Sequence, residues 1–89
     1  MKCFEEVIVT LRFPWIEQDI DMQLPSFMPM EELTVKLLET LRLMMPETFV
    51  KVKSISLKGV KGVLYGQDTL AGAGIWDGSI VTVEKNRGE

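Results

Sequence analysis

Residues 68–83 are the most informative part of this chain for its fold, and they read Asp68-Thr69-Leu70-Ala71-Gly72-Ala73-Gly74-Ile75-Trp76-Asp77-Gly78-Ser79-Ile80-Val81-Thr82-Val83. The first half of this stretch predicts a short loop, in which Ile75 is an apolar side chain that anchors the loop on a core. The pair Asp77-Gly78 is typical of a tight turn, because glycine accepts the positive φ that such turns often need. The last residues predict a strand, since Val81 and Val83 alternate with a polar residue. The chain therefore closes a small mixed sheet with a strand that comes late in the sequence.

Two further alternating runs lie near the start of the chain. Residues 4–13 predict a strand with one buried face. Pro14 interrupts this pattern, because proline cannot donate to a ladder inside a sheet. Residues 19–24 then alternate again, so the two runs predict an antiparallel hairpin. The side chains expected to face the core are Val7, Val9 and Leu11 in the first run and Ile20, Met22 and Leu24 in the second.

The period changes to that of a helix between Met30 and Met44. Pro29 suits the first helical position, and the two glutamates at 31–32 suit the positive end of the helix dipole. Pro46 ends the helix, because the residue before a proline is disfavoured in a helical conformation. A step of 100° per residue gathers one apolar stripe that should face the sheet. Its members are Met30, Leu33, Leu37, Leu38, Leu41 and Met44.

Residues 52–57 predict a third strand, and residues 63–65 predict a short fourth strand after a glycine-punctuated turn. With the closing strand, the order of elements is β-β-α-β-β-β, and the first and last strands must lie side by side. A helix with one apolar stripe, laid on a sheet with one apolar face, gives a two-layer α+β fold. We expect a single domain over residues 1–89, with its core at about 4–85.

Composition and charge exclude several classes of function. The chain has 89 residues, a formal net charge of −3, one cysteine (Cys3) and no histidine. An acidic protein does not favour nucleic acid or an anionic membrane as a partner. Catalysis and metal binding usually need clustered histidine, cysteine or carboxylate side chains, so we expect no enzymatic activity, no cofactor and no metal. No apolar run reaches the length of a membrane span, about 18 residues, and we expect a cytoplasmic location.

Four short motifs carry a resemblance to known proteins. They are the hairpin end Asp21-Met22-Gln23-Leu24-Pro25, the helix start Phe27-Met28-Pro29-Met30-Glu31-Glu32-Leu33, the strand end Leu64-Tyr65-Gly66, and the closing segment 70–79. With the order of elements over residues 4–85, the chain resembles the β-grasp fold of ubiquitin. Within that superfamily it is similar to the YukD-like family, which are small free-standing bacterial ubiquitin-like proteins associated with type VII (WXG100) secretion systems.

The resemblance implies a function by binding. A YukD-like protein would be a cytoplasmic accessory component that docks on other parts of the secretion machine. The family supplies no catalytic residues, and it implies neither covalent conjugation to substrates nor direct insertion in a membrane.

Two other readings remain open. A sulfur carrier or protein modifier of the ubiquitin type needs a bare terminal Gly-Gly, whereas this sequence ends Arg87-Gly88-Glu89, so we disfavour that reading. A ubiquitin-like adaptor of an unrelated complex would look the same in sequence. The sequence does not separate it from the secretion assignment.

The candidate partner-binding residues lie on the side of the sheet that the helix leaves free, and in two connections. Alternation places Ile8, Thr10 and Arg12 of the first strand beside Ile80 and Thr82 of the last strand. Trp15 and Trp76 are large aromatic side chains in loops, and such rigid groups often anchor interfaces. The alternatives are that the two isoleucines are scattered apolar side chains without a function and that each tryptophan folds onto a sheet edge.

A basic run provides a further candidate surface. Lys51, Lys53, Lys58 and Lys61 surround the third strand and the following turn. Such a run is often a solvated face that protects a sheet edge. The alternative is a docking surface for an acidic partner.

Overall fold

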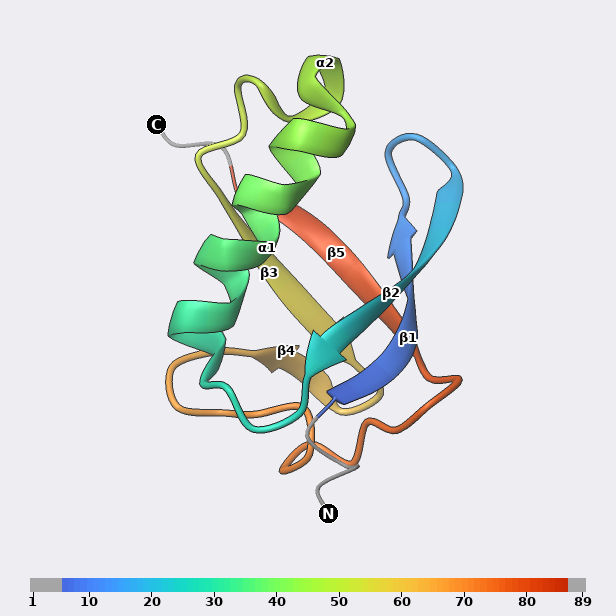
Figure 1. Cartoon of the computed structure of the whole chain (residues 1–89), viewed down its shortest axis with the longest axis vertical. Coiled ribbons are helices and arrows are strands. Elements are labelled where there is room, and N and C mark those ends of the chain that lie inside the picture. The colour runs from blue at the N-terminus through green and yellow to red at the C-terminus, as the bar shows by residue number, and fades with distance from the viewer. Residues whose placement is uncertain (1–5, 87–89) are drawn as a thin grey trace.

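Five strands form one mixed sheet, and the main helix lies across one side of it (Figure 1). The structure is a computed structural model, and it describes residues 6–86. The strand order across the sheet is β2-β1-β5-β3-β4. The elements are β1 (Glu6–Phe13), β2 (Gln18–Pro25), α1 (Met30–Met44), α2 (Pro46–Phe49), β3 (Ser54–Gly59), β4 (Gly62–Leu64) and β5 (Ile80–Asn86).

The first and last strands pair at the centre of this sheet, as the sequence predicted. Strand β5 runs parallel to β1, with Thr10 opposite Ile80 and Leu11 opposite Val81. The neighbouring pairs, β1 with β2 and β5 with β3, are antiparallel. The predicted two-layer α+β arrangement is therefore confirmed.

The core lies between the sheet and α1, and it follows the predicted alternation. Leu11, Val81 and Val83 are fully buried, and Ile75 anchors the loop before β5 as expected. Ile20 and Met22 of β2 are half-buried and pack against the edge of the core. The other buried apolar residues are Val7, Val9, Phe13, Leu24, Met30, Leu33, Leu37, Leu38, Leu41, Phe49, Val52, Ile55, Leu57 and Leu70.

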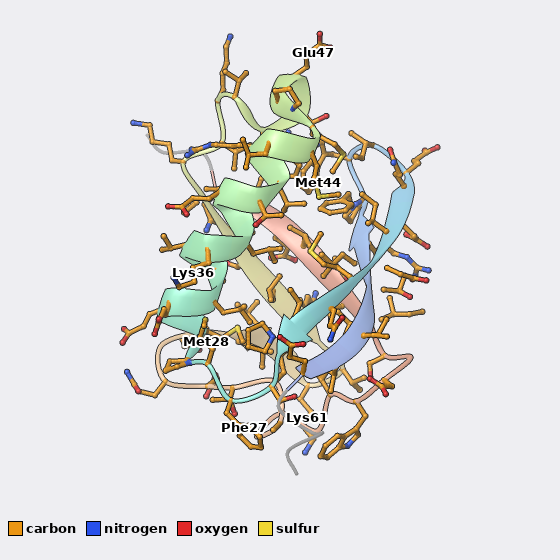
Figure 2. All side chains as sticks on the ribbon, viewed as in Figure 1. Phe27, Met28, Lys36, Met44, Glu47 and Lys61 are labelled. Carbon is orange, nitrogen blue, oxygen red and sulfur yellow. The ribbon has the colours of Figure 1, made fainter. Side chains whose placement is uncertain are left out.

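Helix α1 has the predicted bounds, but two details of the prediction are wrong. Pro29 has an extended backbone (ψ 147°) and precedes the helix instead of forming its first residue. Met44 is 48% exposed, and only the other five predicted stripe residues are buried. Figure 2 shows Met44 near the end of the helix. The stripe therefore ends one turn earlier than the periodicity predicted.

The start of α1 is capped by distant backbone groups and not by a side chain. The N–H groups of Met30 and Glu31 donate to the carbonyls of Asp68 (2.8 Å) and Gly66 (3.0 Å). These N–H groups have no acceptor within the helix itself. The loop that follows β4 thus ties the sheet edge to the helix start.

A second helix, which the sequence did not predict, follows directly. Helix α2 has four residues, starts at Pro46 and ends at the buried side chain of Phe49. The ring of Phe49 packs edge-on against Phe13 and Trp15, with centroid distances of 5.8 Å to each. Pro46 therefore ends α1, as predicted, and also starts the turn that places an aromatic ring in the core.

The strand bounds differ from the prediction at several ends. Strand β3 covers Ser54–Gly59 and not residues 52–57, although Val52 is buried beside it. Strand β4 begins at Gly62 and stops before Tyr65, whose side chain is exposed. The predicted start of the first strand at Phe4, and Cys3 with it, lie outside the described residues.

Candidate interaction surface

The sheet face opposite α1 carries the residues that the sequence singled out. Along β1, the side chains that alternate with the buried positions are exposed or half-buried. The strand register identifies the neighbours of each of these side chains, because residues directly opposite each other on paired strands point to the same face of the sheet. The outer face consists of Ile8, Thr10 and Arg12 on β1, Asp19, Asp21 and Gln23 on β2, Ile80, Thr82 and Glu84 on β5, and Ser56 and Lys58 on β3.

Two isoleucines form the apolar centre of this face. Ile8 is 51% exposed and Ile80 is 49% exposed. Ile80 is paired with Thr10, and Ile8 lies two residues before Thr10 on the same side of β1. The isoleucines are therefore diagonal neighbours across the central strand pair, and half of each remains open to a partner.

Polar side chains surround the isoleucines and are held by contacts within the chain. The Thr10 hydroxyl donates to Asp21 Oδ1 at 2.7 Å. Arg12 donates to both carboxylate oxygens of Asp19, at 3.3 Å each. On the far side, Lys58 Nζ lies 4.0 Å from Glu84 Oε2. These pairs fix the polar rim before any partner arrives, which reduces the ordering cost of binding.

Trp76 lies in the turn that leads into this face. The backbone N–H of Trp76 donates to Ser79 Oγ, and the backbone carbonyl of Trp76 accepts from the Ser79 backbone N–H, both at 3.0 Å. Gly78 adopts φ +88° in this turn, which confirms the predicted Asp-Gly turn. The turn is attached to β1, because the Ile8 N–H donates to Asp77 Oδ1 at 2.8 Å. Trp76 is 56% exposed, so it offers a rigid aromatic group on a fixed support.

Trp15 has a different position from Trp76. It is half-buried at the edge of the core, with its ring 5.7 Å from that of Phe13 and with its indole nitrogen buried. The ammonium of Lys85 lies 5.0 Å from the Trp15 ring centroid and covers it. This is the packing of a tryptophan on a sheet edge, and it leaves Trp15 apart from the two isoleucines.

The predicted basic run does not form one surface. Lys58 lies on the outer sheet face beside Glu84, and Lys61 lies at the opposite end of the molecule from Glu47 of α2 (Figure 2). Lys51 and Lys53 line a groove together with Lys85 of β5. Sequence reasoning did not include Lys85, although alternation from Val83 places it on the helix side of β5.

Within residues 6–86, no three histidine, cysteine, aspartate or glutamate side chains are grouped so that they could hold a metal ion. In the same part of the chain, no helix is long and apolar enough to cross a membrane.

Comparison with known proteins identifies the fold. No protein-family profile and no curated protein sequence matches the chain. Solved structures do match it. The ubiquitin-like domain of EccD5 from Mycobacterium xenopi superposes with a TM-score of 0.72 at 15% identity, covering 94% of this chain and 98% of that one. The chain therefore has the ubiquitin-like β-grasp fold that the sequence resemblance predicted.

Two further solved structures match the chain. The ubiquitin-like domain of the type VII secretion protein EccD1 of Mycobacterium tuberculosis matches with a TM-score of 0.68 at 21% identity, over 89% of this chain and 97% of that one. A chain of the ESX-5 inner membrane complex matches with a TM-score of 0.72 at 16% identity, over 96% of this chain and 22% of that one. Ubiquitin-like domains of type VII secretion proteins are thus among the structural neighbours, in agreement with the resemblance drawn from the sequence.

Proposed function

We propose that this chain is a non-conjugated ubiquitin-like interaction module and a cytoplasmic accessory component of a type VII secretion system, of the YukD-like kind. It acts as one domain and binds a protein component of the machine through the outer sheet face. No covalent step is involved. The structural likeness to ubiquitin-like domains of EccD proteins supports the secretion assignment.

The observation that carries the binding role is the pair Ile8 and Ile80 on the face that α1 leaves uncovered. Each side chain is about half exposed. Their polar neighbours are already paired within the chain. An apolar centre inside a polar rim is the usual anatomy of a protein–protein interface. Trp76, on the adjoining turn, extends this surface as an aromatic anchor.

The test is affinity purification of the tagged full chain from its native cells, with mass spectrometry of the proteins that are retained. We expect subunits of a type VII machine. The double substitution Ile8→Asp/Ile80→Asp should release them, because it places two charges where the partner must bury apolar area. Burial of a whole isoleucine contributes about 1.5–3 kcal/mol. With half of each side chain still to bury, about 1.5–3 kcal/mol is lost for the pair, or roughly 10- to 150-fold in affinity.

The matched control is Val35→Asp/Leu43→Asp, which introduces the same charges at two exposed aliphatic positions of α1. Circular dichroism must show that both double variants are folded. If the Ile8/Ile80 variant retains the same subunits as the control, the sheet face is not the binding surface. If the retained proteins belong to an unrelated complex, or are joined to the chain covalently, the secretion assignment or the non-conjugated role fails instead.

A further inference from the structure

A second surface, independent of the outer sheet face, lies at the α2 end of the molecule. A groove of about 620 Å³ lies between the segment 47–53 and the end of β5. Three lysines line it, Lys51, Lys53 and Lys85, together with Asn86, the exposed apolar side chain of Val50 and one acid, Glu47. We refer to it as the lysine groove.

The backbone holds Lys51 and Lys53 in place. Val52, between them, is buried in the core, so the two lysines on either side must point outward. Arg42 of α1 donates from Nη2 to the Val52 carbonyl at 2.6 Å. It also donates from Nε to the Phe49 carbonyl at 3.4 Å. This wall of the groove is therefore attached to the main helix and is not a loose loop.

Lys85 lies on the opposite wall of the groove, and a different set of contacts holds it. It follows Val83 on the helix side of β5, beyond the last buried position of that strand, and is paired in register with Ile55. Its ammonium lies over the face of Trp15 at 5.0 Å, a favourable cation–π position. Trp15 is in turn held edge-on by Phe13 and Phe49. The aromatic cluster thus positions the third charge of the groove.

Among residues 6–86, the groove lysines form no ion pair. The ion pairs among residues 6–86 are Arg12 with Asp19 and Lys58 with Glu84. Neither involves a groove lysine, and Glu47 is the one carboxylate in the lining. Three lysines therefore line one concave surface on a protein whose formal net charge is −3. A local positive charge on a protein that is negative overall favours binding of an anionic ligand in this groove and not over the whole surface.

We propose that the lysine groove binds an acidic, extended segment of a protein partner. Val50 adds an apolar contact beside the lysines, which a peptide can use and a free phosphate cannot. A nucleic acid would gain little, because base stacking needs open aromatic faces and Lys85 covers Trp15.

The test uses the full chain and a fluorescein-labelled glutamate-rich peptide that contains one leucine, with fluorescence anisotropy at low salt. An otherwise identical peptide with glutamine in place of glutamate should not bind. Each exposed ion pair contributes roughly 1.4- to 5-fold in affinity. Lys51→Gln/Lys53→Gln should therefore weaken binding about 2- to 30-fold, and the remaining affinity should fall as salt is added.

Two further variants separate a site from general charge. Lys36→Gln/Lys61→Gln removes the same charge from α1 and from the opposite end of the molecule (Figure 2), and it should weaken binding less than the groove variant does. Glu47→Gln removes the acid of the groove and should tighten binding roughly 1.4- to 5-fold. A gain of affinity cannot come from a folding defect.

Several results would overturn the proposal. They are equal losses in the two double-lysine variants, equal binding of the glutamine peptide, or tighter binding to a single-stranded oligonucleotide or to phosphatidylserine vesicles than to the acidic peptide. Sedimentation provides one more: if the groove variant abolishes dimers of the chain and leaves peptide binding unchanged, the occupant is a second copy. Because this test uses no component of a secretion machine, its result is independent of the function proposed above.

Discussion

Phe49→Ala should cost this fold a large part of its stability, although Phe49 belongs to a helix of four residues. Its ring is fully buried and packs against the rings of Phe13 and Trp15. Truncation of a buried phenylalanine to alanine costs about 3–5 kcal/mol, since apolar burial is lost and a cavity remains. Native domains are stable by only about 5–15 kcal/mol. For a domain of this size, 1 kcal/mol shifts the Tm by about 4–8 °C, so a fall of at least about 12 °C is expected.

Thermal and urea unfolding, followed by circular dichroism and by tryptophan fluorescence, measure this loss. Phe49→Leu keeps much of the apolar volume and should cost less, about 1.5 kcal/mol. Val50→Ala is the matched control, because Val50 is the next residue but is exposed, and its effect should stay within about 0.5 kcal/mol. If Phe49→Ala costs no more than Val50→Ala, α2 does not pack on the sheet. The position of Lys51, Lys53 and Lys85 in one groove would then lose its physical basis.

Two other substitutions test the loop before β5 and the corrected helix stripe. Gly78→Ala should lower the free energy of unfolding by about 1–2 kcal/mol, measured by urea unfolding. The residue has φ +88° and an added Cβ would meet nothing within 4 Å, so the whole cost is backbone conformation. An unchanged urea midpoint would show that the turn relaxes to another conformation. Leu41→Ala should lower the free energy of unfolding by about 2–5 kcal/mol, and Met44→Ala should lower it clearly less. The reason is that Leu41 is fully buried whereas Met44 is 48% exposed. Similar losses at both positions would show that Met44 belongs to the core.

The sequence predicted the bounds of α1, because several signals agree there. Prolines flank both ends, and the apolar period is regular over four turns. The failure at Met44 has a geometric cause. Periodicity shows on which side of a helix a residue lies, but it does not show where the sheet beneath the helix ends. Helix α2 was missed because four residues are too few to show a period, and its apolar residue Phe49 carried no signal beyond its own hydrophobicity.

The outer sheet face was predictable because alternation and strand order are both visible in the sequence. Ile8 and Ile80 lie where alternation placed them, and whether a partner binds there remains a prediction. The lysines show the opposite case. Proximity in sequence grouped Lys58 and Lys61 with Lys51 and Lys53, whereas the fold separates them. Alternation indicates the side of β5 on which Lys85 lies. Its place beside Lys51 and Lys53 depends on strand pairing over a long sequence separation, which no local pattern shows.

Strand β5 lies between β1 and β3, yet it comes last in sequence among the five strands of residues 6–86. During synthesis on the ribosome, β1 and β3 therefore lack the strand with which both pair until β5 has emerged. The two halves of the sheet, β2-β1 and β3-β4, have no direct pairing with each other. Contacts between segments so far apart in sequence form slowly, since loop closure precedes any gain from pairing. A nascent chain that is stalled before residue 80 should thus stay protease-sensitive, and it would be available to chaperones as an incompletely folded chain.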